Sequence, residues 1–570
     1  MKRFFLFLVA ILIVGSAGYF LIARPKGLDL LALVPADSLA VLDWDSPAGS
    51  YQSFLDTSFA EKLQGIDWPV ILSTLGYNKG EIAGAGSVAS RWKLFSEGLF
   101  FRELFGKRTV VALLPEKDTV RDPVTSIRNT MVLLSHSGGK FKNFQSMIAG
   151  SPLTTQLQRR NYQGYTIRGY LVKDRYPVYV VTDNDLLIAA FDPAPIQQCL
   201  DLLLAMLVRK GGAMVDNPAF SELKQRARGR DDFFLYFDVA ALKPLLRQIS
   251  LQRVIGFEYN SDISDIMGHG LRQIGLYHQP MGRVHQLTAG MLFDKSGLPS
   301  FQKHLAGRAP IENENLSLVP ANLQIFLWSN WFDLSRWWQA TRENSTGRDL
   351  KRVDRLDAAV RKYTGIGMER FLDLFGDQFS LIIKEIATSG FFPVPRICIR
   401  IALADQETVE TLLEKFITDL PHRRDMVATV PVVSVLAADG LMQPSYALFD
   451  NDLLFADGRD LIEDILKPGR DFLVHDPDFV KLDMVMQEPE NLIAFARTGQ
   501  LINGLKELVS WLGTNIAIRD ERAGAKSKIL IDQAVIPLLD GLTMFKAGAL
   551  RGYTREDELV LQSRVLMVDE

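Results

Sequence analysis

Three serines in the sequence stand three residues before a lysine, so each pair lies about one helical turn apart. The pairs are Ser90/Lys93, Ser137/Lys140 and Ser221/Lys224. In acylases of the SxxK type, the lysine removes the proton of the serine nucleophile. The nearest match to their third motif, Lys295-Ser296-Gly297, lies in a stretch of linker composition. Three matches to so loose a pattern indicate chance, so we assign no catalytic residue and expect a protein that is not an enzyme.

Two histidines, His278 and His285, flank a predicted hairpin turn at Met281-Gly282. Side chains directly opposite each other on paired strands lie about 5 Å apart, close enough to share a metal ion. The sequence offers them no third ligand. We therefore predict no metal site.

Two identical Asp-Asn-Asp-Leu-Leu segments, residues 183–187 and 450–454, carry paired carboxylates. A calcium site needs six or more oxygen ligands, and each segment supplies too few. Asp and Asn tolerate the left-handed conformation, so both segments predict β-hairpins. The stretch Ser137-Gly138-Gly139-Lys140 lacks the GxxxxGK[ST] spacing of a phosphate-binding loop. The sequence thus predicts no cofactor.

Four of the eight tryptophans gather in one short stretch, LWSNWFDLSRWWQ, as Trp328, Trp331, Trp337 and Trp338. One interpretation is a core strand followed by an amphipathic helix that packs its aromatic side chains inward. The alternative is an exposed aromatic surface for a glycan, a lipid or another protein. On that alternative, these four residues are the candidate partner surface.

The composition narrows the function class. A chain of 570 residues exceeds the size of a single core, so two or more domains are expected. The net charge is −3 and no long basic run occurs, which argues against a nucleic-acid partner. The two cysteines, Cys199 and Cys398, lie in apolar segments and are expected to be free and buried. A disulfide between them stays open.

The amino terminus carries an apolar segment, residues 4–23, without one charged side chain. About 20 helical residues cross a hydrocarbon core about 30 Å thick. We therefore predict that residues 1–26 form a transmembrane anchor with the amino terminus inside. The protein would then be a single-pass protein of the inner membrane, with the bulk of the chain in the periplasm. The alternative is a signal peptide cleaved near Ser16-Ala17-Gly18.

The rest of the chain contains one series of motifs twice. LVPA at residues 33–36 recurs at 318–321, LFG at 104–106 recurs at 374–376, and DNDLL recurs as described above. Residues 216–220 resemble 475–479, and the segments that begin at Gly270 and Gly541 are also similar. Five matches in one order predict a tandem duplication, with copy one at residues 27–294, a linker at 295–314 and copy two at 315–570.

Each copy alternates short strands with helices and closes with a hairpin. Hairpins join antiparallel strands, so the predicted fold class is α+β. We expect two tandem homologous domains, each with a largely antiparallel sheet and packed helices, after one N-terminal transmembrane helix.

The anchor, the opening LVPADSLAVLDWDSP, the DNDLL hairpins and the (D/N)P-x-F segments together resemble a bacterial family of membrane-anchored envelope proteins. Its domains have no known function, and its repeats open with an "LPAD" segment. The second copy departs from this pattern, because Asn322 stands at the position of Asp37. The resemblance implies an exported α+β protein and no substrate, cofactor or catalytic residue.

These observations predict a non-enzymatic, membrane-anchored periplasmic protein that binds, scaffolds or helps to assemble partners. The partner would be an envelope protein, a lipid or a glycan. One alternative is a carrier of lipids or other hydrophobic ligands, which requires an apolar cavity. Another is an extracytoplasmic hydrolase with a nonstandard site. The ligand, the oligomeric state and the cleavage of the N-terminal segment stay open.

Overall fold

The computed structural model of the protein divides into two compact units. It describes residues 28–116, 123–149, 154–173, 175–207, 211–227, 232–246, 270–387, 394–437, 442–467, 471–482 and 488–568. The first unit falls within Met1–Pro47, Leu99–Arg226 and Leu235–Gln248. The second falls within Ala48–Gly98, Ala227–Phe234 and Ile249–Glu570.

Unit 1 is built on an antiparallel sheet. Its strands are β1 (Ala40–Trp44), β2 (Thr109–Leu113), β3 (Met131–Ser135), β4 (Thr154–Gln156), β5 (Arg160–Tyr162), β6 (Tyr165–Val172), β7 (Tyr176–Asp183) and β8 (Leu186–Ala190). They pair in the order β1–β2–β3–β8–β7–β6–β4, and β5 also pairs with β6. Burial alternates along β1 and along the start of β3, as expected for a sheet with one face in a core.

Helices accompany the sheet of unit 1. They are η1 (Leu30–Leu33), α6 (Leu99–Phe105), α7 (Pro123–Thr130), α8 (Gly138–Ala149), α9 (Pro193–Leu207), η2 (Met214–Asp216), α10 (Pro218–Ala227) and α11 (Val239–Leu246). Strand β9 (Phe233–Asp238) contains a boundary between the two units. One core cluster of unit 1 joins Leu104 and Phe141 to Tyr170, Val180 and Leu187.

Unit 2 holds the remaining strands. They are β10 (Leu271–Met281), β11 (Val284–Phe293), β12 (Ile325–Ser329), β13 (Phe375–Ala387), β14 (Val394–Leu403), β15 (His422–Val427), β16 (Val430–Val435), β17 (Ser445–Phe449), β18 (Asp452–Ala456), β19 (Leu492–Ala496), β20 (Phe545–Arg555) and β21 (Glu558–Met567). Their pairing order is β15–β16–β17–β18–β14–β13–β12–β19–β20–β21–β11–β10. The stretch from β15 to β12 follows the same order as β4 to β1 in unit 1.

The prediction of two tandem domains, each with its own sheet, is wrong. Strand β11 ends the predicted first copy, and β21 ends the second. The two strands pair directly, from Val284 opposite Leu566 to Leu292 opposite Glu558. Unit 2 therefore contains parts of both predicted copies. The sequence motifs did not reveal this pairing because strand partners distant in sequence leave no local signal.

The helices of unit 2 are distributed along the whole chain. They are α2 (Pro47–Leu55), α3 (Ser58–Gly65), α4 (Trp68–Leu75), α5 (Lys79–Glu97), η3 (Lys295–Gly297), α14 (Ser300–Ala306), η4 (Glu314–Leu318), α15 (Leu334–Asn344), α16 (Gly347–Thr364), α17 (Met368–Leu372), α18 (Gln406–Ile417), α19 (Arg459–Leu466), η6 (Leu473–His475), α20 (Pro477–Leu482), α21 (Thr498–Arg519), α22 (Glu521–Leu530), η7 (Ile531–Val535) and α23 (Ile536–Leu542).

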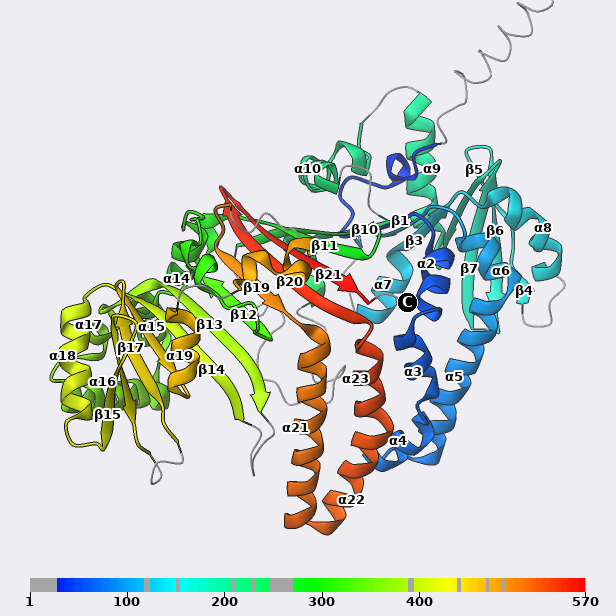
Figure 1. Cartoon of the computed structure of the whole chain (residues 1–570). Helices are drawn as coiled ribbons and strands as arrows, with labels where there is room; N and C mark the ends of the chain where they lie inside the picture. Colours follow the sequence, from blue (N-terminus) through cyan, green and yellow to red (C-terminus); the bar gives the residue numbers. More distant parts are fainter. Residues whose placement is uncertain are drawn as a thin grey trace, which may run out of the picture. The chain divides into compact units, whose positions relative to one another are not determined.

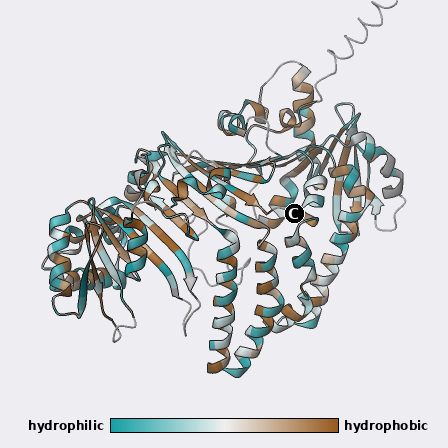
Figure 2. Ribbon diagram, in the orientation of Figure 1, coloured by the Kyte–Doolittle hydropathy of each residue, from teal (hydrophilic) through white to brown (hydrophobic). Residues whose placement is uncertain are grey.

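Helices α3, α4 and α5 pack with α21, α22 and α23, and we call these six helices the helical arm (Figure 1). Several of these helices start at an N-cap residue whose side chain accepts a hydrogen bond from a backbone N–H. These residues are Thr57 at α3, Asp67 at α4 and Asp520 at α22. Hydrophobic and hydrophilic residues are interspersed along α21 and α23 (Figure 2). Ile66 at the end of α3, Ile71 of α4 and Ala534 of η7 form a buried cluster, against which Leu538 of α23 packs.

The predicted linker, residues 295–314, packs as part of unit 2. It contains η3 and α14, and Ile311 forms an isolated antiparallel bridge with Glu490. Helix α14 thus lies against the sheet, and this contact creates one of the pockets described below.

The predictions of a transmembrane helix, a signal anchor and a single-pass inner-membrane location need correction. Among the residues that the structure describes, no helix combines the length and the apolar character needed to cross a bilayer. The segment on which those predictions rested, residues 4–23, lies outside the described residues.

Candidate functional site

A pocket of about 270 Å³ lies between the hairpins of unit 2 and helix α14, and we call it the linker pocket. Its lining residues come from the sheet, from the linker and from the segment after β12. They are Leu271, Met291, Phe293, Leu298, Gln302, Leu305, Ala306, Trp331, Thr554 and Leu559. All of them are apolar except Gln302 and Thr554. The pocket therefore suits a hydrophobic group.

A buried polar network holds one wall of the linker pocket in place. Asn491 donates to Asn330 Oδ1 at 2.9 Å and accepts from the backbone N–H of Thr554 at 2.9 Å. Thr554 donates in turn to the carbonyl of Arg308 at 2.7 Å, which ties β20 to the linker. The backbone N–H of Trp331 donates to Ser329 Oγ at 3.0 Å. Asn330 and Asn491 are both buried, so the network is shielded from water and fixes the chain on either side of it.

The four predicted tryptophans do not form one surface. Trp328 is fully buried in a core cluster of unit 2, and its indole N–H donates to Gln378 Oε1 at 3.3 Å. Trp338 is also buried, beside Val353 and Leu372. Trp337 is 49% exposed on α15. Trp331 lines the linker pocket. Because successive residues of a strand or a helix face different directions, these aromatic side chains lie in three environments: the core, the solvent-exposed surface and the linker pocket.

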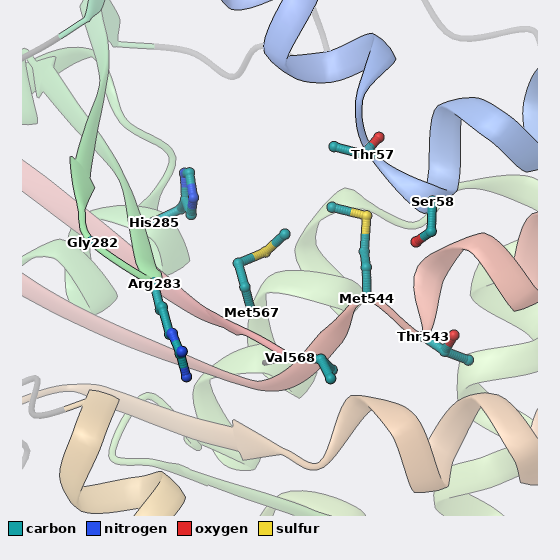
Figure 3. A pocket seen from close by; sticks show the side chains of 9 residues that line it. All are labelled: Thr57, Ser58, Gly282, Arg283, His285, Thr543, Met544, Met567 and Val568. Carbon is teal, nitrogen blue, oxygen red and sulfur yellow. The ribbon is translucent and has the colours of Figure 1, made fainter. Parts of the chain in front are cut away.

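A second pocket, of about 600 Å³, lies beside the β10–β11 turn, and we call it the hairpin pocket (Figure 3). Its lining residues come from the start of α3, from the turn and from both ends of the β20–β21 hairpin. They are Thr57, Ser58, Gly282, Arg283, His285, Thr543, Met544, Met567 and Val568. Thr57 and Ser58 lie across the pocket from His285, while Arg283 extends from the turn in another direction (Figure 3).

The two predicted histidines do meet, although not directly opposite each other. The turn comprises Gly282 and Arg283 rather than Met281 and Gly282, because Met281 pairs with Val284. His278 therefore faces Leu287, and His285 faces Pro280. The histidines are diagonal neighbours on one face of the hairpin, with ring centroids 5.3 Å apart.

Asp232, His278 and His285 form a hydrogen-bonded chain, which we call the histidine relay. Nδ1 of His278 lies 2.8 Å from Asp232 Oδ1, and Nε2 of His278 lies 3.1 Å from Nδ1 of His285. An ionised Asp232 accepts only, so Nδ1 of His278 must carry a proton. When His278 is neutral, its Nε2 accepts from His285, and the remaining nitrogen of His285 is then an acceptor.

Electrostatics favour the neutral form of His285. Burial lowers the pKa of His285, because charging an imidazole away from water is costly, and the neighbouring His278 acts in the same direction. Asp232 opposes both effects. Within the described residues, no group of three or more His, Cys, Asp or Glu side chains is arranged to hold a metal ion.

None of the serine–lysine pairs is joined by a hydrogen bond that would activate the serine. The hydroxyls of Ser90, Ser137 and Ser221 donate to Gly86 O, Ser135 Oγ and Val215 O at 2.8, 3.0 and 2.8 Å. Lys93, Lys140 and Lys224 form ion pairs with Glu97, Glu103 and Asp43 at 3.8, 2.5 and 2.9 Å. Each side chain is thus engaged elsewhere.

The Asp-Asn-Asp segments form the predicted hairpin turns. Asn184, Asp450 and Asn451 have φ of +47°, +55° and +59°, the left-handed conformation that these residue types tolerate. Both cysteines are free and buried, Cys199 in unit 1 and Cys398 in unit 2. Burial raises the pKa of each thiol to about 12, so neither is reactive.

Sequence reasoning missed Asp232 and the lining of the linker pocket. Asp232 precedes β9, far along the chain from His278, and no spacing rule connects them. Leu298 and Leu305 carry the apolar pattern of a short amphipathic helix inside a segment of linker composition. This apolar pattern was the sequence feature that could have indicated that the segment packs against the rest of the protein.

Comparisons with known proteins give little guidance. No protein-family model matches this chain, and neither does any curated protein. Among solved structures, crystal forms III, IV and I of TP0453 match at 10%, 11% and 11% identity with TM-scores of 0.26, 0.25 and 0.24. They cover 50%, 47% and 47% of this chain and 89%, 83% and 79% of their own. Likenesses this weak support no statement about function.

Proposed function

We propose that this chain is a non-enzymatic binding protein that holds a neutral aliphatic ligand in the linker pocket. The observation that carries the proposal is the lining, in which Gln302 and Thr554 are the polar residues among otherwise apolar side chains. Burial of apolar surface contributes about 0.8 kcal/mol per methylene, so a short alkyl chain gains substantially there.

The volume of the pocket limits the size of the ligand. Its volume of about 270 Å³ exceeds the roughly 150 Å³ of an apolar cavity that binds benzene, and it lies just below the usual range for drug-sized ligands. A medium-length aliphatic chain matches this volume. Gln302 offers a donor and an acceptor for a single hydroxyl or ester group at one end of the ligand, and the Thr554 hydroxyl, whose proton goes to the carbonyl of Arg308, offers an acceptor.

Other features support binding rather than chemistry at this site. The lining contains no acid, base or thiol. The polar network around Asn330 and Asn491 fixes Trp331 and Thr554, so the pocket is largely preformed and little ordering entropy opposes binding.

The proposal is tested with decanol on the full-length chain by native mass spectrometry and calorimetry. We expect one decanol per chain. Leu305→Trp should fill the pocket and weaken binding about tenfold or more, since loss of two methylene contacts corresponds to that factor. Leu512→Trp, at an exposed leucine of α21, is the matched control and should bind as the wild type does. Equal decanol affinity in wild type and Leu305→Trp would disprove the proposal.

A further inference from the structure

The hairpin pocket differs from the linker pocket in its charge. Its lining combines three hydroxyl side chains, two methionines, one arginine and one histidine. None of these nine residues, all of them in the described part of the chain, is acidic. An anion with an attached apolar part therefore matches both the charge and the surface of this pocket.

His285 is the residue of this pocket whose protonation can change near neutral pH. Its Nδ1 is bonded to His278, so its Nε2 lies on the other side of the ring. When both imidazoles are neutral, His285 Nε2 carries a lone pair and repels an anion. A proton added to Nε2 reverses this, because His285 can pass its Nδ1 proton to His278 Nε2. The positive charge then rests on His278 beside Asp232, and His285 Nε2–H becomes a donor.

Other charged groups close to His285 could also take up or release the proton, so the groups around it must be identified. Among the described residues, the charged or titratable groups that the structure places in the relay or in the lining of this pocket are Asp232 before β9, His278 on β10 and Arg283 in the turn. On β21, Val565 pairs with His285. Arg564 belongs to the opposite face, where it donates to Gln286 Oε1 at 2.8 Å. The groups from α3 and from the segment after α23 are the neutral hydroxyls of Thr57, Ser58 and Thr543.

We propose that the hairpin pocket is a second ligand site, which takes an amphiphilic anion and couples its binding to the uptake of one proton by the histidine relay. The anionic group accepts a hydrogen bond from His285 Nε2, and Met544 and Met567 contact the apolar part. Arg283, at the rim, attracts the anion without a direct bond to it. The lowered pKa of His285 supports this coupling, because His285 stays neutral until an anion or a lower pH favours the added proton.

The test uses 8-anilinonaphthalene-1-sulfonate, whose sulfonate stays ionised across the range in which histidines titrate. The full chain carries Leu305→Trp throughout, so that the probe cannot use the linker pocket. From about pH 8 to about pH 5.5, affinity should rise about fivefold to tenfold, as one added nearby charge predicts. Calorimetry in two buffers of different ionisation enthalpy should show uptake of about one proton per probe near neutral pH.

Variants separate the relay from general effects of pH. His285→Gln should bind with an affinity independent of pH, and Asp232→Asn should shrink the pH effect while His285 stays in place. Arg283→Gln should weaken binding similarly at both pH values. His304→Gln is the matched control, since His304 also pairs with an aspartate, Asp333, at 2.8 Å. It should behave as the parent does.

An undiminished pH effect in both His285→Gln and Asp232→Asn would overturn the proposal, as would absence of proton uptake in the parent. If one of these variants fails to fold, the other still decides. Decanol binding is measured separately on the wild-type chain, so failure of the linker-pocket proposal would leave this result interpretable.

Discussion

Nε2 of His278 lies 3.1 Å from Nδ1 of His285, and their rings stack with planes 16° apart. A charge on one of two imidazoles in this arrangement disfavours a charge on the other, and His278 is accordingly one cause of the lowered pKa of His285. Asp232 holds the far end of the pair at 2.8 Å. We therefore expect a change in the protonation of His285 to affect this hairpin.

The stability of the protein should depend on His285 in mildly acidic solution. The pKa of His285 is lowered in the folded chain, so the unfolded chain binds a proton more readily below its ordinary value of 6.5. Stability is therefore lost as the pH falls below about 6.5. Urea unfolding across this range should show a smaller loss for His285→Gln than for the wild type. An identical loss in both would exclude His285 as the cause.

Glu490 should have the opposite pH dependence. Burial raises its pKa to about 7, and Arg551 opposes this only in part, although the two groups are 3.0 Å apart. The folded chain then holds a proton that the unfolded chain releases above its ordinary value of 4.5, so stability falls as the pH rises toward 7. The stability of Glu490→Gln relative to the wild type should therefore increase as the pH rises over this range. Glu385→Gln, at an exposed position of β13, should show no such gain.

Two neighbouring tryptophans should differ sharply in their contribution to stability. Trp328→Ala removes a fully buried side chain from a core cluster of unit 2 and should cost about 3–5 kcal/mol of unfolding free energy. Trp337→Ala, at a half-exposed position, should change it by about 0.5 kcal/mol or less. Chemical denaturation measures both. Similar losses would mean that the register of β12 or α15 is different.

The helical arm should require glycine at position 524. A Cβ there would lie 2.3 Å from Ala517 Cα, on the facing helix α21. Gly524→Ala should therefore destabilise the protein by about 1–3 kcal/mol, since the backbones must separate. Gly84→Ala is the control within α5, where a Cβ meets nothing within 4 Å. It should stabilise the protein by up to about 1 kcal/mol, because alanine favours helix. Thermal unfolding of both variants checks this.

The sequence predicts local features better than distant ones. The Asp-Asn-Asp hairpins follow from the tolerance of Asn184 and Asn451 for positive φ, which is a property of the residues themselves. The pairing of β11 with β21 depends instead on partners far apart in the chain. The motif repeats suggested separate domains because they carry no information about which strand edges meet.

The site was predictable only in part for the same reason. The spacing of His278 and His285 indicated that they meet, but the turn was misplaced by one residue, and the partner Asp232 had no local signal. The tryptophan stretch included one pocket residue, Trp331, among two core residues and one exposed residue. The periodicity of apolar residues predicts which side chains share one face of a strand or helix. Only the packing of α14 shows which of these faces borders a pocket.

The central claim is that a neutral aliphatic ligand contacts Trp331 in the linker pocket. Bromodecanol tests it most directly, because bromine quenches the fluorescence of a tryptophan that it touches. We predict saturable quenching in the wild type and loss of most of it in Trp331→Phe, which retains an apolar ring and should still bind decanol by calorimetry. Equal quenching in the two proteins, or no saturation in the wild type, would contradict the account.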